Sequence, residues 1–200
     1  MRKGKQNMEN DIIAKAKEYI LQLFENNADG HDAEHSLRVY KNAKKIAESY
    51  PECDLPVVLL SALLHDVDDH KLFSTENNEN ARRFLNSQSV AEETTERICQ
   101  IINSVSFSQN RGKHPDSLEG MIVQDADRLD AIGAVGIART FAYGGKHSRS
   151  MDSSVQHFYD KLLLLKEEMN TPAAISIAEE RHAFKENFLA QYQKETAERS

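Results

Sequence analysis

Hydrophobic residues recur along most of the chain at the three- and four-residue spacing of an α-helix. Near the N-terminus, Ile13, Ala16, Ile20 and Phe24 would share one face of such a helix. No segment alternates apolar and polar residues in the way that a half-buried strand does. Helices are therefore predicted over residues 10–26, 33–49, 55–64, 76–87, 90–105 and 118–130, with 131–142 either continuing the sixth or restarting after Gly133. Two more are predicted after residue 153, with a break at 170–172 and the last covering 173–200.

The pattern predicts an all-α fold. We expect residues 1–200 to form a single domain, because no repeat or linker interrupts the helical periodicity. Residues 1–9 are polar and are expected to be flexible. The chain holds only 8 glycines and 4 prolines, which also favours helices over a turn-rich β fold.

Residues 55–69, LPVVLLSALLHDVDD, stand out from this pattern. The first ten are apolar apart from one proline and one serine, as expected of a helix buried on most of its faces. His65, Asp66, Asp68 and Asp69 then follow almost at once. Charge is costly at the end of a core helix, so we expect either that this end reaches solvent or that a cation lies there. A bound metal ion is the interpretation we favour.

The charge balance narrows the classes of partner. A formal net charge of −7 argues against a general nucleic-acid binder, which needs a basic face. No apolar run is long enough for a membrane span, and no signal peptide is visible at the N-terminus. Cys53 and Cys99 form no CxxC pair, so reduced thiols and a cytoplasmic location are expected.

Residues of metal-ligand type fall at several predicted helix ends and faces. His35 lies in the first turn of its helix, His65 and Asp66 close the apolar helix, and Asp127 lies where another helix turns from apolar to charged. Two imidazoles and two carboxylates would suit a divalent first-row metal that keeps open positions for water. Spacing alone cannot choose between Asp66 and Asp69, because Asp69 shares a helix face with His65.

Three separated motifs resemble the HD superfamily of metal-dependent phosphohydrolases. They are H-x-x-R-V at 35–39, L-x-H-D at 63–66 and D-x-D-R-L-D at 125–130. Longer matches at 30–39, 65–71, 125–139 and 157–162 resemble a bacterial single-domain subgroup known as YedJ-like or YpgQ-like. The resemblance implies an all-helical HD-domain bundle with the metal site at its centre. It also implies that the ligands are His35, His65, Asp66 and Asp127, which resolves the choice in favour of Asp66.

Further residues are candidates for catalysis and substrate binding. Asp69 lies three residues after Asp66, where related nucleotidases place an acid near the attacking water. Arg38 would face the same side of its helix as His35 and could hold a phosphate, and His31 could receive the leaving group or support a ligand. Candidate phosphate contacts are Lys71, Arg128, Arg139, Lys146, His147 and Arg149, the last three in a segment, 144–149, that two glycines could make flexible.

The expected function is therefore hydrolysis of a small phosphorylated substrate, most favourably a nucleotide, by one divalent metal ion. Pyrophosphate release from a nucleoside triphosphate and dephosphorylation of a monophosphate are not separated by the sequence. Mn²⁺ is preferred and Mg²⁺ second, while the imidazoles also permit Fe, Co, Ni or Zn. The alternatives are a diiron oxygenase of the same fold and a non-catalytic metal- or ligand-binding module. Both a monomer and a homodimer are compatible with the sequence.

Overall fold

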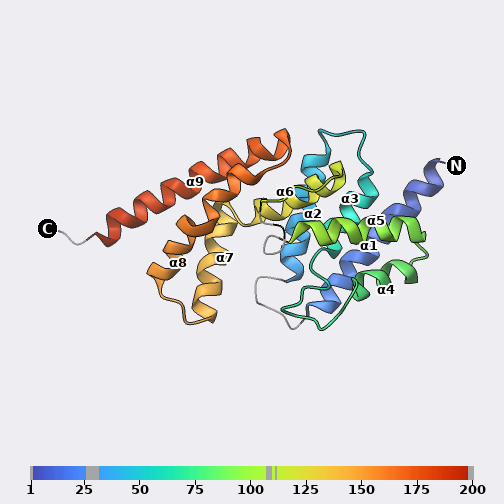
Figure 1. Ribbon diagram of the computed structural model, residues 1–200, viewed down its shortest axis with the longest axis horizontal. Helices are drawn as coiled ribbons and strands as arrows, with labels where there is room; N and C mark the ends of the chain where they lie inside the picture. The colour runs from blue at the N-terminus through green and yellow to red at the C-terminus, as the bar shows by residue number, and fades with distance from the viewer. Residues whose placement is uncertain (1, 26–31, 107–109, 111, 198–200) are drawn as a thin grey trace. The chain divides into compact units, whose positions relative to one another are not determined.

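A computed structural model describes residues 2–25, 32–106, 110 and 112–197, and these residues form helices and connecting turns without a strand (Figure 1). The α-helices are α1 (Arg2–Leu23), α2 (Ala33–Ala47), α3 (Leu55–Leu64), α4 (Glu79–Ser87), α5 (Glu92–Val105), α6 (Leu118–Asp130), α7 (Gly133–Lys146), α8 (Met151–His157) and α9 (Pro172–Thr196). A π-helical turn, η1 (Phe158–Leu162), and a 3₁₀ turn, η2 (Leu164–Glu168), lie between α8 and α9. The prediction of an all-α fold is confirmed.

The chain divides into two compact units, Met1–Asp127 and Arg128–Ser200. The boundary falls inside α6, directly after one of the predicted metal ligands. The single domain expected over the whole chain stays a prediction. No helix in the described part of the chain is both long enough and apolar enough to cross a membrane.

The first unit is built around α3, the apolar helix predicted from the sequence. Every residue from Val57 to Leu64 is buried, and the helix packs against α1, α2 and α5. Burying one Val or Leu side chain is worth about 1.5–3 kcal/mol relative to leaving it exposed, so this helix supplies much of the stability of the unit. The predicted position of α3 is confirmed.

Both ends of α3 have a local cause. At its start, Asp54 accepts a hydrogen bond from the Val57 N–H at 3.4 Å, and Pro56 occupies the first turn. At its end, the N–H of Val67 bonds the carbonyl of Leu64 at 3.3 Å, one residue nearer than in an α-helix. His65 and Asp66 therefore lie at the point where the helix gives way to tighter turns.

Several boundaries differ from the predictions. The first helix, α1, begins at Arg2 rather than residue 10, since polar residues such as Lys, Gln and Glu carry only a small helical penalty. Helix α4 begins later than predicted because Asn77 and Asn78 have left-handed backbones, with φ of 53° and 57°. Helix α7 extends to Lys146, beyond the predicted end at residue 142.

The second unit contains α7, α8 and α9 with the turns η1 and η2. Its core includes Phe158, Leu165 and Leu189. Lys185 is fully buried and donates a hydrogen bond to the carbonyl of Leu162 at the end of the π-helical turn. Burial lowers the pKa of Lys185 to about 8, because the ammonium form loses its hydration.

Candidate metal centre

The N-terminus of α2 fixes the first candidate ligand. Asp32 caps the helix by accepting a hydrogen bond from the backbone N–H of His35 at 2.7 Å. His35 is consequently held in the first turn, and its side chain is only 3% exposed.

His65 is oriented by its own helix. Its Nδ1 lies 2.9 Å from the carbonyl oxygen of Ala62, which can only accept a hydrogen bond. In the neutral imidazole, the proton must then be on Nδ1, and Nε2 presents a lone pair. Fixing the tautomer in this way is typical of metal-binding histidines.

The carboxylates of Asp66 and Asp127 both approach the Nε2 atoms of His35 and His65. The two Nε2 atoms lie 3.2 Å apart. Asp66 offers a separate oxygen to each ring, Oδ2 at 3.4 Å from His35 and Oδ1 at 3.4 Å from His65. Oδ1 of Asp127 lies 3.3 Å from Nε2 of His35 and 3.8 Å from that of His65.

This geometry fits a divalent cation. Neighbouring ligand atoms around one such ion are about 3.0–3.4 Å apart, close to the separations given above. Two nitrogen atoms that face each other can share only one proton, and two largely buried carboxylates side by side with them need positive charge nearby. The two-nitrogen, two-oxygen donor set suits Mn²⁺ and its first-row neighbours.

The electrostatics of Asp127 agree with a site for positive charge. Burial alone would raise the pKa of this carboxyl, but the hydrogen bond with His35 and the electrostatic interactions with His65 and His35 outweigh it. The pKa of Asp127 is therefore held below its ordinary value, and the group is an anion at neutral pH. Within the described residues, His35, His65 and Asp127 form the one group of three whose ligand atoms all lie within 4.8 Å of one another.

The predicted catalytic residues have different surroundings. Asp69 is in the turn after the HD pair, with a 13% exposed side chain that accepts the backbone N–H of Lys71 at 2.8 Å. Arg38 is half-buried on α2, almost one turn beyond His35. His31 lies outside the described residues. The roles given to Asp69, Arg38 and His31 stay predictions.

Lys71 is exposed in the first unit, and the other predicted phosphate contacts belong to the second unit. Arg128 is 2% exposed, and its guanidinium bonds the carbonyl of Glu168 and pairs with that residue's carboxylate at 3.4 Å. Arg139 pairs with the buried Asp130 at 2.5 Å. Both arginines thus have structural contacts inside their own unit, and their binding of phosphate stays a prediction.

The predicted flexible segment at 144–149 is partly helical. Gly144 and Gly145 lie within α7, and a Cβ at Gly144 would come within 2.5 Å of Ser154 Oγ. Gly144 therefore permits close packing of α8 rather than providing a hinge. Lys146, His147 and Arg149 are exposed, and the ring of His147 stacks on Tyr143 at 3.9 Å. Their contact with phosphate stays a prediction.

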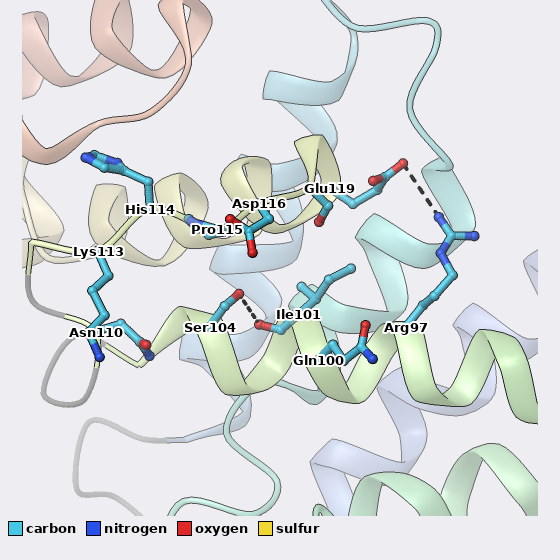
Figure 2. Close-up of a pocket in the computed structure, with 11 residues that line it drawn as sticks. Arg97, Gln100, Ile101, Ser104, Asn110, Lys113, His114, Pro115, Asp116 and Glu119 are labelled. Carbon is cyan, nitrogen blue, oxygen red and sulfur yellow. Dashed lines mark hydrogen bonds and ion pairs between the residues drawn. The ribbon is translucent and has the colours of Figure 1, made fainter.

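A separate depression of about 340 Å³ lies in the first unit, between the end of α5, the residues that follow it and the start of α6 (Figure 2). Figure 2 shows Arg97 facing Glu119 at one end and Lys113 beside Asn110 at the other. Glu119 also accepts the backbone N–H of Asp54 at 2.9 Å, which links α6 to the start of α3. This depression therefore includes contacts that support the fold, and it contains none of the predicted ligands.

Sequence reasoning missed two sets of polar contacts beside the candidate ligands. Asn42 on α2 donates to the carbonyl of Ala126 at 3.1 Å, next to Asp127. Asp68 accepts the backbone N–H groups of Asn80 at 2.9 Å and Ala81 at 3.0 Å. The only sequence signal for Asp68 was its place in the acidic run, where it could not be separated from its neighbours.

Comparisons with known proteins agree with this geometry. The HD domain family model matches residues 32–132. The uncharacterized protein YpgQ of Bacillus subtilis is 40% identical over 186 residues, covering 88% of this chain and 90% of YpgQ. The crystal structure of YpgQ in complex with ADP has a TM-score of 0.82 at 33% identity, covering 96% of this chain and 98% of that one.

A second solved structure carries a family description. The HD-superfamily hydrolase from Bacillus thuringiensis has a TM-score of 0.78 at 39% identity, covering 94% of this chain and 97% of that chain. The model match spans the segment that carries His35, His65, Asp66 and Asp127. This chain belongs to the HD domain family and resembles its hydrolases along nearly its whole length.

Proposed function

We propose that this protein is a divalent-metal-dependent phosphohydrolase that acts on a small phosphorylated substrate, with a nucleotide as the favoured class. The observation that carries the proposal is the cluster of His35, His65 and Asp127 in the first unit, with Asp66 beside both imidazoles. A divalent ion held there would supply Lewis acidity and make a bound water more acidic. The family relationship to hydrolases supports the same reaction class.

The protein's own groups have separate roles in this proposal. Asp69, one turn after Asp66, would orient the attacking water and accept its proton. Arg38 would neutralise charge on the phosphate, since a guanidinium can form two parallel hydrogen bonds to it. Lys71 and the basic residues of the second unit remain proposed phosphate contacts. His31 stays a candidate for support of a ligand or of the leaving group.

A nucleotide is favoured for two reasons. The YpgQ structure was determined in complex with ADP, and that protein aligns with nearly all of this chain. The resemblance to the single-domain subgroup favours release of pyrophosphate from a nucleoside triphosphate over dephosphorylation of a monophosphate. Mn²⁺ is the proposed ion, with Mg²⁺ second, and a cytoplasmic location stays a prediction.

A release screen tests this function. Metal-free protein would be incubated with nucleoside mono-, di- and triphosphates and with Mn²⁺, Mg²⁺, Co²⁺ or Ni²⁺, and free phosphate and pyrophosphate would be measured separately. We expect pyrophosphate from a triphosphate with Mn²⁺, and none with the Asp66→Ala variant. If no metal supports release from any nucleotide, the nucleotide proposal fails.

The same preparations separate the alternatives. Two irons per chain and oxygen uptake with a polyol would identify a diiron oxygenase. Metal binding that depends on His65 and Asp66, without turnover of any phosphorylated compound, would identify a binding module. The geometry of the described residues gives no specific support to either alternative.

A further inference from the structure

The segment that carries two of the proposed ligands is not part of a regular helix. Helix α3 ends at Leu64, and the next residues form tight turns in which the N–H of Asp69 bonds the carbonyl of Asp66 at 3.1 Å. His65, the C-cap of α3, still has helical backbone angles, but the residues that follow it lie beyond the regular hydrogen bonding of the helix. Another element has to hold this turn in place if both side chains are to meet His35 and Asp127.

Asp68 makes that connection. Its Oδ1 accepts the N–H of Asn80 at 2.9 Å, and its Oδ2 accepts the N–H of Ala81 at 3.0 Å. The side chain of Asn80 donates in return to the carbonyl of Val67 at 2.8 Å. Three hydrogen bonds thus join residues 67–68 to the first turn of α4, and Val67, Asn80 and Ala81 are all buried.

The first turn of α4 depends on this carboxylate. The residue at its N-cap position, Asn78, has a left-handed backbone and makes no side-chain capping bond. Asp68 supplies the cap from a distant part of the sequence, and its negative charge is favourable at a helix N-terminus.

Helix α4 is itself firmly packed. Phe84 stacks on Tyr19 with ring centroids 4.9 Å apart, and Arg82 makes two hydrogen bonds to Glu96 on α5, at 2.7 and 3.0 Å. Ala81 and Leu85 are fully buried. The helix can therefore serve as a fixed support for the turn that carries Asp68.

We propose that Asp68 is a positioning residue for the metal centre: by capping α4, it holds the 65–69 turn so that Asp66 faces both imidazoles. Asp68 lies two residues from Asp66, but its oxygens bond α4 whereas those of Asp66 approach the histidines. The inference rests on the metal centre of the proposed function, not on the identity of the substrate.

The test measures Mn²⁺ affinity by calorimetry on metal-free full-length protein. We expect Asp68→Ala to bind Mn²⁺ about 10- to 100-fold more weakly, the range usual for residues that orient ligands. Asp68→Glu keeps the charge but displaces it by one methylene, so it should lose affinity to a similar extent. Asp68→Asn keeps the shape and one acceptor oxygen, and its loss should be smaller.

A matched control separates positioning from general stability. Thr171 caps α9 in the second unit by accepting the N–H of Ala174 at 3.3 Å. Thr171→Ala should lower the melting temperature of the metal-free protein and leave Mn²⁺ affinity within about twofold. If Asp68→Ala does not fold, Asp68→Asn and Asp68→Glu still give the comparison.

Two outcomes would overturn the proposal. Retention of Mn²⁺ affinity by folded Asp68→Ala, within about twofold of the parent, would reduce the residue to a structural cap. If Asp68→Glu alone retained the Mn²⁺ affinity of the parent, the negative charge at residue 68, rather than its position, would be the cause of the effect. The Mn²⁺ titration contains no substrate, so its result does not depend on whether the protein is a phosphohydrolase. Unchanged Mn²⁺ affinity in the Asp68 variants would likewise not contradict the proposed hydrolysis.

Discussion

The buried lysine of the second unit gives a prediction with a definite sign. The pKa of Lys185 is lowered from 10.5 to about 8 because its ammonium is removed from water. Between these two values, the unfolded chain holds the proton more tightly than the folded protein does. The free energy of unfolding should therefore rise with pH across this window, and the penalty for burying the ammonium is fully present below pH 8.

The magnitude follows from the size of the shift. One pKa unit corresponds to about 1.4 kcal/mol, so the shift from 10.5 to about 8 gives an upper limit of about 3.4 kcal/mol over the window. The hydrogen bond from the ammonium to the carbonyl of Leu162 is part of the folded state to which that pKa applies. Glu186, whose charge favours the ammonium, is also included in the net shift.

The comparison of Lys185 with Lys185→Met isolates this effect. Methionine keeps most of the side-chain volume but cannot titrate, so other groups that ionise at high pH cancel in the difference. Urea unfolding of both proteins at intervals from pH 7 to 10.5 would give the two free energies. Between pH 8 and 10.5, we expect the free energy of unfolding of the parent to rise relative to that of the variant by about 1.4 kcal/mol per pH unit. A difference that stays constant within about 0.5 kcal/mol would refute the reasoning.

Three further predictions concern the packing at Gly144, the hydrogen bond from Asn42 and the binding of Mn²⁺. Gly144→Ala should destabilise the protein by about 1–3 kcal/mol, because its Cβ would meet Ser154 Oγ at 2.5 Å. Gly145→Ala, where a Cβ meets nothing within 4 Å, should be neutral or stabilising by up to about 1 kcal/mol, and equal melting temperatures for the two variants would contradict this packing. Asn42→Ala should cost about 1 kcal/mol in thermal unfolding through the lost bond to Ala126, and an unchanged melting temperature would argue against that link. Mn²⁺ at 100 times its dissociation constant should stabilise the parent by about 2.7 kcal/mol, and the same shift in the Asp127→Ala variant would exclude this site.

Much of the fold followed from local patterns. The apolar run from Val57 to Leu64 predicted a buried helix, since such a segment can hide its side chains only in a core. The boundaries that differed depended on less regular features. The left-handed backbones of Asn77 and Asn78 delay α4, and α7 continues through Gly144, which packs closely against Ser154.

The site was predictable to a different depth. Spacing located His65 and its neighbouring carboxylates, but only the order of motifs along the chain selected Asp66 over Asp69. The structure groups His35, His65 and Asp127, and it places Asp66 beside both imidazoles. The hydrogen bonds between Asp68 and α4 join residues that are separated by 12 and 13 positions in the sequence. Such pairing has no periodic signature in the sequence.

The number of Mn²⁺ ions bound per chain tests the metal centre most directly. Calorimetric titration of metal-free full-length protein should give one ion per chain, and Asp127→Ala should bind none under the same conditions. Absence of binding by the parent, or unchanged binding by Asp127→Ala, would contradict a centre formed by His35, His65, Asp66 and Asp127.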